Sequence, residues 1–247
     1  ENNICLCRFT EDIRNMHQRI QFLHSKPQEK KVFQAVECDI HETAKNKKGK
    51  RRFVIMHDQT LNRMCGLSGK NIYQKKLTYQ KIRSKYHIKT GNNIESYTKK
   101  QLRIPSLEEY LSICKRYHMK PVIEIKQKMK KDTIKRLYQS LKKAKMQNQA
   151  VVTCKYKQQL TYMRKYARKM PLEYVRHDFT QNDLSWMKKY HINVSINKNI
   201  LSDDMIQLFE RNNIKINIWT INNKDQLYNF TNKGIKIVTS DDTLWKE

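Results

Sequence analysis

The sequence predicts a (β/α)8 barrel, and three observations lead to that prediction. Short runs rich in Val, Ile and aromatic residues alternate with longer amphipathic runs along most of the 247 residues. The predicted helices are followed within a few residues by strand-like runs, which is typical of parallel βα units. A chain of this length also suits one closed barrel. We therefore expect residues 1–247 to form a single barrel domain.

Nine segments have the composition and length of β-strands. An eight-stranded barrel needs one fewer, so we expect one of them to be a short strand outside the barrel. The nine segments are residues 3–9, 32–40, 52–57, 121–126, 150–155, 172–177, 192–196, 215–221 and 235–240.

Several helices begin at recognisable capping residues. Ser106 is followed three positions later by Glu109, which is the pattern of a capping box. Three further helices are expected to begin at Asp132, Ser202 and Asn223, because Asp, Ser and Asn are favoured at the first position of a helix.

The segment 58–103 interrupts this alternation. It contains three of the five glycines and one helical pattern, at residues 78–87. A polar stretch of this length inside a compact fold is more typical of an active-site insertion than of a linker.

The formal net charge of +28 has two interpretations. A strongly positive protein attracts polyanions such as nucleic acid, anionic membrane surfaces or anionic polymers. A general preference for Lys, Asn and Ile would give the same charge without a dedicated partner, and the lysines are spread along the chain. Nucleic acid is the least favoured partner, because charge alone supports it and no recognised reading motif is present.

The six cysteines include no CxxC pair and fall mostly in apolar patterns. They are expected to be reduced and structural, which argues against a zinc site and favours the cytoplasm. No apolar run is long enough to cross a bilayer, and no signal segment opens the chain. Membrane association through sequence upstream of Glu1 stays open.

Two carboxylates and a histidine share one face of a predicted strand. In AVECDIHET (residues 35–43), Glu37, Asp39 and His41 alternate with apolar residues, and alternate residues of a strand point the same way. Carboxylates are poorly tolerated in an apolar core. Either this face is exposed, or a cation lies between the carboxylates.

Two later strands end in residues of the same kind. The segment 52–57 ends in His57 and is followed by Asp58, and the segment 121–126 places Glu124 and Lys126 on one face. The carboxyl ends of barrel strands meet at one mouth, so these groups are expected to converge there. Each group alone could be an ordinary exposed residue, but their matching positions favour a site. Carboxylate ligands suit Mg²⁺ or Ca²⁺ better than Zn²⁺.

The sequence resembles the glycerophosphodiester phosphodiesterase family. The segments VECDIHET, FVIMHDQTLNRMCGLSGK, KLTYQKI, IPSLEEYL, VIEIK, INIWTIN and GIKIVTSDD follow one another in that family's order. The similarity is good over residues 34–126 and 211–242 and weaker between them. It implies a (β/α)8 barrel in which the insertion 58–103 shapes the substrate end of the pocket.

The resemblance also implies roles for individual residues. The metal-binding carboxylates of the family, which usually hold Ca²⁺ or Mg²⁺, match Glu37, Asp39 and Glu124. One of its two catalytic histidines matches His57. The same comparison makes Lys126 a neutralising partner of the phosphate and Trp219 part of the wall that packs the glycerol or alcohol group.

The first strand departs from the family pattern. The family carries a His-Arg-Gly motif there, and this sequence has no such tripeptide. In one alignment Cys7 replaces the histidine, Arg8 keeps the phosphate-binding arginine and Phe9 replaces the glycine. In the other, Glu1-Asn2 is the remnant of a Pro-Glu-Asn segment and the first strand is lost. The first alignment is favoured because the second leaves the barrel one strand short.

The implied reaction hydrolyses a glycerophosphodiester, either a lipid headgroup or a glycerol-phosphate polymer, to an alcohol and glycerol 3-phosphate. The metal, Arg8 and Lys126 would stabilise the charge on the phosphate, while two histidines move protons. Only His57 is in place, which leaves two hypotheses. Another group such as His41 compensates and the protein is a phosphoric diester hydrolase, or it is a degenerate relative that binds phosphodiesters or anionic polymers without efficient turnover.

Overall fold

The computed structural model of the protein describes residues 4–8, 34–90 and 94–241. All nine predicted strands are present in it, with ends that differ from the predicted ones by at most three residues. The strands are β1 (Ile4–Arg8), β2 (Ala35–Glu42), β3 (Phe53–Ile55), β4 (Lys120–Ile125), β5 (Val151–Cys154), β6 (Leu172–Arg176), β7 (Asn193–Asn197), β8 (Ile216–Trp219) and β9 (Ile237–Ser240).

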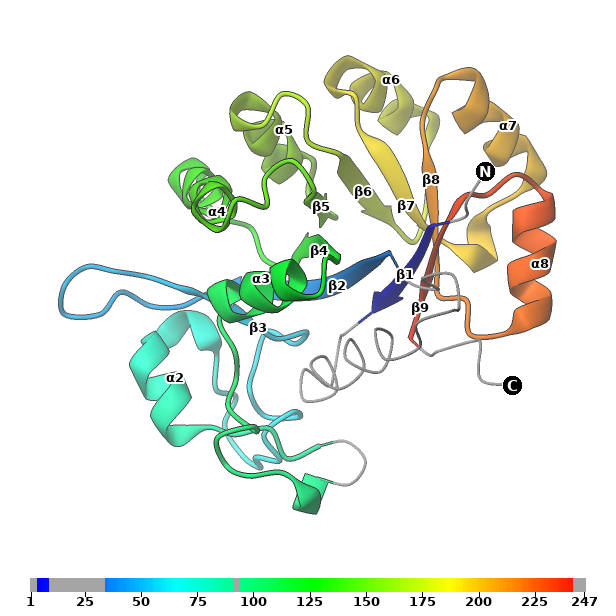
Figure 1. The fold of residues 1–247 in the computed structure, drawn as a ribbon. Helices are drawn as coiled ribbons and strands as arrows, with labels where there is room; N and C mark the ends of the chain where they lie inside the picture. Colours follow the sequence, from blue (N-terminus) through cyan, green and yellow to red (C-terminus); the bar gives the residue numbers. More distant parts are fainter. Residues whose placement is uncertain (1–3, 9–33, 91–93, 242–247) are drawn as a thin grey trace.

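Eight of these strands close into a parallel barrel. Neighbouring strands pair in the order β1, β9, β8, β7, β6, β5, β4, β2, and β1 pairs with β2 as well as with β9, which completes the ring. The predicted extra strand is β3, which has three residues and pairs antiparallel with β2 on the outside of the barrel (Figure 1). The predicted (β/α)8 class is therefore confirmed.

Helices surround the barrel, as Figure 1 shows for α4 to α8. The α-helices are α2 (Tyr79–Lys85), α3 (Leu107–Arg116), α4 (Lys131–Ala144), α5 (Lys157–Tyr166), α6 (Gln181–Tyr190), α7 (Asp203–Arg211) and α8 (Lys224–Asn232). Three 3-10 helices are η1 (Gln74–Lys76), η2 (Ile94–Ser96) and η3 (Lys198–Ile200).

The capping predictions hold at three helices and fail at one. The Ser106 hydroxyl accepts from the Glu109 amide and the Glu109 carboxylate accepts from the Ser106 amide, which completes the capping box. Ser202 and Asn223 also cap their helices with side-chain oxygens. The predicted start at Asp132 is wrong by two residues, because Lys130 occupies the capping position of α4 and Asp132 lies in its first turn.

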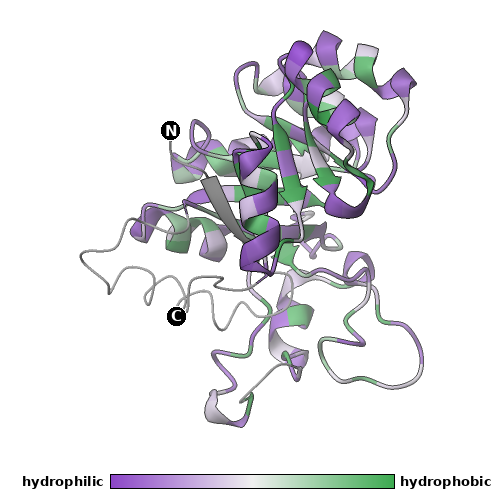
Figure 2. Cartoon of the chain, turned by 90° about the vertical axis from the view of Figure 1, so that its right-hand side faces the viewer, coloured by the Kyte–Doolittle hydropathy of each residue, from purple (hydrophilic) through white to green (hydrophobic). Residues whose placement is uncertain are grey.

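The main core lies between the outer face of the barrel and the helices. Figure 2 shows apolar strands inside and polar outer faces on the helices. Tyr110 of α3 is fully buried there, and its hydroxyl donates to the Val36 carbonyl at 2.6 Å and lies 3.3 Å from the Val122 carbonyl. One helix side chain thus fastens β2 to β4, the two strands that carry the predicted carboxylates.

The predicted insertion 58–103 forms a lobe beside the barrel (Figure 1). Its one predicted helix is present as α2, which Thr78 caps by accepting from the Lys81 amide. The lobe has a hydrophobic cluster of its own, made of Val54, Met56, Leu61, Met64, Cys65, Ile82, Tyr86, Ile88 and Ile104. The insertion is therefore a packed substructure and not a linker.

Four cysteines in the part of the chain with described side chains are buried and free, namely Cys38, Cys65, Cys114 and Cys154. Burial raises the pKa of all four thiols, to about 11 for Cys65. They behave as small apolar residues, as predicted. Among the described helices, none combines the length and the apolar character that a membrane span requires.

A buried carboxyl group joins three strands across the barrel interior. The Glu173 carboxyl of β6 accepts from the Asn217 side-chain amide of β8 at 2.9 Å, and the Asn217 carbonyl accepts from the Thr239 hydroxyl of β9 at 2.9 Å. Burial raises the pKa of Glu173 to about 7, against the lowering effect of the Asn217 hydrogen bond.

Glu173→Gln is therefore expected to make the stability of the protein less dependent on pH. The raised pKa favours the protonated form in the fold, so wild type loses stability between about pH 4.5, where the unfolded chain ionises, and about pH 7, where folded Glu173 ionises. The variant should be more stable than wild type at pH 8, by roughly 1–3 kcal/mol, and similar at pH 4.5. Urea unfolding at both pH values measures this difference.

Exposed Glu210→Gln is the matched control, because it removes the same charge from the surface. A stability difference between Glu173→Gln and wild type that is equal at pH 4.5 and pH 8 would contradict the assignment.

Candidate active site

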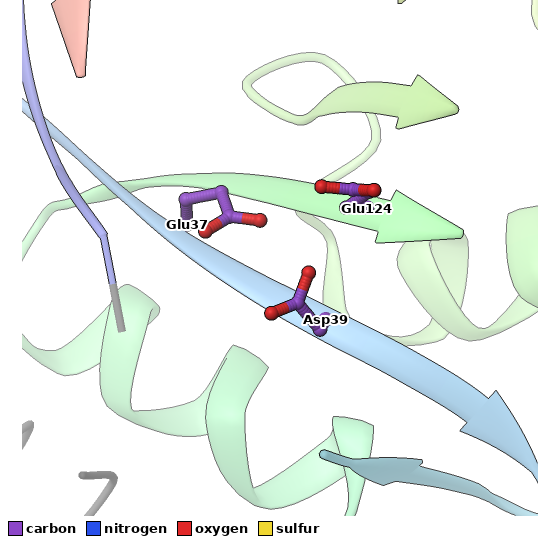
Figure 3. Close-up of side chains that lie close together, drawn as sticks. All are labelled: Glu37, Asp39 and Glu124. Carbon is purple, nitrogen blue, oxygen red and sulfur yellow. The ribbon is translucent and has the colours of Figure 1, made fainter. Parts of the chain in front are cut away.

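Three carboxylates converge inside the barrel. Glu37 and Asp39 lie two residues apart on β2, and the β2–β4 ladder places Asp39 directly opposite Glu124. All three side chains are buried, and one oxygen from each lies within 4.8 Å of the others. Figure 3 shows the carboxylates of both strands turned into the same space. The structure therefore brings together the three predicted metal ligands.

Lys126 lies directly beside this group. Its ammonium nitrogen is 3.1 Å from the Asp39 Oδ1 and 2.9 Å from the Glu124 Oε1. Burial lowers the pKa of Lys126, but the attraction of Asp39, Glu124 and Glu37 outweighs it and raises the pKa overall. The lysine is charged, and it offsets part of the negative charge of the carboxylates.

The donor set fits a hard divalent cation. In the part of the chain with described side chains, this is the one group of three or more potential ligands close enough to hold a metal ion, and all three members are carboxylates. Oxygen-only coordination by carboxylates is typical of Mg²⁺ and Ca²⁺, whereas structural zinc sites use Cys and His.

His57 is hydrogen-bonded to Asp58, and Asp58 is hydrogen-bonded to Arg63. The His57 Nδ1 lies 2.8 Å from the Asp58 Oδ1. Arg63 donates to both oxygens of Asp58, at 2.7 Å from Nε and 2.9 Å from a terminal nitrogen. These hydrogen bonds lower the pKa of Asp58 to about 2, despite partial burial. Ionised Asp58 therefore accepts the Nδ1 proton, which leaves the lone pair of neutral His57 on Nε2.

The backbone next to His57 is tied to the strand of the carboxylates. The Met56 amide donates to the Asp39 carbonyl at 3.0 Å. The His41 Nε2 lies 3.2 Å from the His57 carbonyl, and the His41 Nδ1 lies 3.3 Å from the Gln127 side-chain oxygen. Burial lowers the pKa of His41, so the ring is neutral near pH 7. His41 contacts the His57 backbone and is 2% exposed.

The first strand of the barrel is β1, as the favoured alignment requires. Its register places Arg8 opposite Glu37 and Cys7 opposite Val36 on β2. Arg8 therefore shares the register position of Glu37, a residue of the site. The side chains of Cys7 and Arg8, and the whole of Phe9, lie outside the described part of the structure.

Trp219 lies at the carboxyl end of β8, where the predicted wall of the pocket would be. Its ring packs edge-on against His177, with centroids 4.8 Å apart. His177 directly follows β6 and is exposed. The two rings, one at the end of β8 and one directly after β6, form an edge-to-face aromatic pair.

Sequence reasoning missed four residues of this arrangement. The sequence placed Asp58 beside His57 without a role for it, and the orienting function of Asp58 depends on Arg63, five residues later. Gln127 and His177 were not predicted at all, because their contacts are to residues far away in the sequence. The adjacent His57 and Asp58 at the end of a strand are the one sequence signal that could have indicated these hydrogen bonds.

The fold and the site define a (β/α)8-barrel protein with an acidic centre inside the barrel. The family model described as "Glycerophosphoryl diester phosphodiesterase family" matches residues 30–244. The chain therefore belongs to this family of phosphoric diester hydrolases, which confirms the resemblance seen in the sequence. Among curated proteins, none matches the chain.

Several solved structures share the fold. A phosphodiesterase from Oleispira antarctica, solved in complex with the product sn-glycerol-3-phosphate, has a TM-score of 0.79 and 16% identity, over 96% of this chain and 92% of the other. A putative glycerophosphoryl diester phosphodiesterase from Silicibacter pomeroyi has a TM-score of 0.78 and 13% identity, over 97% and 90%. A putative glycerophosphodiester phosphodiesterase from Galdieria sulphuraria has a TM-score of 0.75 and 12% identity, over 97% and 94%.

Asp58→Asn is expected to lower the kcat of phosphodiester hydrolysis about 10- to 100-fold and leave KM within twofold of wild type. The amide can donate a hydrogen bond to Nδ1, which favours the wrong tautomer of His57, while the substrate contacts stay in place. Steady-state kinetics on glycerophosphocholine measure this effect.

Asp203→Asn is the control, because it removes an exposed ion pair between the first residue of α7 and Lys233, neither of which contacts the described residues of the site. Equal kcat values for Asp58→Asn and wild type would contradict an orienting role for Asp58.

Proposed function

We propose that the protein hydrolyses glycerophosphodiesters to an alcohol and glycerol 3-phosphate, with Ca²⁺ or Mg²⁺ held by Glu37, Asp39 and Glu124. The observation that carries the proposal is the convergence of these buried carboxylates within 4.8 Å. Family membership and a fold shared with a product-bound phosphodiesterase support the same reaction class.

A divalent cation bound by the three carboxylates would polarise the phosphoryl oxygens of the substrate. Lys126, which already lies beside Asp39 and Glu124, would supply a further positive charge to the phosphate. Arg8 shares the register position of Glu37, and we assign it to the phosphate as well. Trp219 and His177 would pack the alcohol or glycerol group.

His57 is the proton-transfer residue of the proposal. With Nδ1 engaged by Asp58, the Nε2 atom has no hydrogen-bond partner within the described part of the structure. It can take a proton from the attacking water, because the free nitrogen of a neutral imidazole is a proton acceptor. Asp58 stabilises the imidazolium that this transfer forms, since its low pKa keeps it ionised.

His41 is a positioning residue in this scheme. Both of its ring nitrogens lie close to hydrogen-bonding groups, at the His57 carbonyl and at Gln127. It links the strand of Asp39 to the loop that carries His57. This arrangement favours a role in placing His57 over a role as the second proton-transfer group.

The absence of a histidine in the first strand supports a second candidate function, the binding of phosphodiesters without efficient turnover. Loss of one member of an acid/base pair costs on the order of 10²- to 10⁴-fold in rate. The two candidates therefore differ in kcat and not in the ability to bind a phosphodiester.

Addition of Ca²⁺ or Mg²⁺ is expected to raise the melting temperature of wild type, because a ligand of the folded state stabilises it by roughly 3 kcal/mol at a hundred times Kd. Glu37→Gln and Glu124→Gln should lose this shift. Their melting temperature without the cation can rise, since each removes a like charge from the group, so the readout is the change on cation addition.

The control is exposed Glu108→Gln, which should retain the wild-type shift. A shift that persists in both site variants would contradict the assigned ligands.

Wild type is expected to release glycerol 3-phosphate from glycerophosphocholine only with a divalent cation present. His57→Ala should lower kcat at least 10²-fold, because the remaining residues cannot supply its proton transfer. A coupled assay for glycerol 3-phosphate measures both effects. Cation-dependent binding of glycerophosphocholine without turnover would select the second candidate, and neither binding nor turnover would contradict both.

A further inference from the structure

A cationic cavity adjoins the proposed active site. It has a volume of about 1050 Å³, and it is lined by eight basic and two acidic residues. Six of the basic residues are lysines from three separate segments, namely Lys45, Lys50, Lys75, Lys76, Lys128 and Lys130. We call this feature the lysine cavity. Six lysines from separate parts of the sequence are therefore gathered around one cavity.

The lysine cavity lies next to the site at two strand ends. Glu42 lines the cavity at the end of β2, three residues beyond Asp39, which is about 10 Å along a strand. Gln127 also lines it and directly follows Lys126, and its side chain meets His41. Gln59, which follows Asp58, lines the cavity as well, so the cavity begins beside residues that neighbour the site.

The three lysine segments are fixed relative to one another. The β2–β3 hairpin, which projects from the barrel in Figure 1, carries the first, and its turn is held by the Asn46 side chain, which accepts from the amides of Lys48 and Lys50 at 3.0 and 2.9 Å. The Ala44 amide donates to the Leu77 carbonyl at 2.8 Å, which ties the hairpin to the segment after η1.

Glu42 anchors the same hairpin to α4. It pairs with Arg136 and with Arg51 and accepts from the Thr133 hydroxyl at 3.2 Å. Glu42, one of the two acidic residues of the cavity wall, is thereby paired with two arginines. The six lysines are exposed and, in the described part of the chain, form no ion pair with an acid, so their charge is available to a ligand.

The two aromatic rings of the cavity are covered by lysines. Lys75 and Lys76 lie 5.7 and 5.3 Å from the centroid of the Tyr73 ring, and Lys128 lies 5.5 Å from that of Tyr156. Single-stranded nucleic acids are bound through bases that stack on open aromatic rings, which this arrangement does not offer. A bilayer surface is flat and takes inserted apolar side chains, whereas this wall is concave and basic.

We propose that the lysine cavity binds the further phosphates of a linear polyphosphodiester built from glycerol phosphate units, while one unit occupies the carboxylate centre. The proposal rests on the proposed function for the unit in the centre, and it names the substrate class as a polymer. A cavity with six unpaired lysines has more charge than a small diester with one phosphate can use.

The test compares two triple variants with equal loss of charge. One is Lys50→Gln, Lys76→Gln and Lys128→Gln, with one residue from each lysine segment. The other is Lys142→Gln, Lys143→Gln and Lys189→Gln, at exposed positions near the carboxyl ends of α4 and α6. The probe is a labelled synthetic glycerol phosphate octamer, and its binding is followed by fluorescence anisotropy in EDTA, so that no turnover is needed.

The cavity variant should bind the octamer at least tenfold more weakly than wild type, and its affinity should depend less on salt concentration. The affinity of the control variant should fall less than twofold. With a divalent cation present, the cavity variant should show a raised KM for the octamer and an unchanged KM for glycerophosphocholine. Failure of the proposed function would appear as no hydrolysis of either substrate, with the EDTA binding experiment still interpretable.

Equal weakening in both triple variants would overturn the proposal, because net charge alone would then explain binding. Loss of binding to vesicles with phosphatidylglycerol in the cavity variant, with octamer binding intact, would assign the cavity to a membrane surface instead. Tighter binding of a single-stranded oligonucleotide with the same number of phosphates, lost in the cavity variant, would assign it to nucleic acid.

Discussion

The structure depends on how three like charges are held together on two neighbouring strands. Two carboxylates with oxygens within 4.8 Å of each other repel by at least roughly 3 kcal/mol at an effective dielectric constant of 20. The β2–β4 ladder and the Tyr110 hydroxyl nevertheless fix the strands that carry them. Such an arrangement is stable with a cation at its centre, which is the role of Lys126 and, in our proposal, of Ca²⁺ or Mg²⁺.

The lobe formed by residues 58–103 serves this centre. Its own hydrophobic cluster gives it a defined shape, and it supplies Arg63, which donates to Asp58, and Gln74, whose amide donates to the Asp58 carbonyl at 2.6 Å. Because Asp58 holds His57, the packing of the lobe determines where the imidazole stands. This is a physical reason for an insertion at this point of the barrel, between the short outer strand β3 and helix α3.

The sequence was sufficient for features that depend on local pattern. Strand composition located all nine strands, and the alternation in residues 35–43 placed Glu37 and Asp39 on one face. Features that depend on tertiary contacts were out of reach. The contact between the His41 and Gln127 side chains joins residues 86 positions apart. The lysine cavity is lined by three segments, and none of them shows a binding motif in the sequence. Helices α5 and α6 were not predicted, although Thr180 and Asp183 form a capping box at the start of α6.

The most direct test of the central claim is anomalous diffraction from crystals of the protein soaked with Mn²⁺, a probe for the cation that the carboxylates would hold. The account predicts one strong anomalous peak within about 2.0–2.6 Å of a carboxylate oxygen from each of Glu37, Asp39 and Glu124. Lys126 should then have moved away from at least one of its two carboxylate partners. No peak at this position, with Lys126 still bridging Asp39 and Glu124, would contradict it.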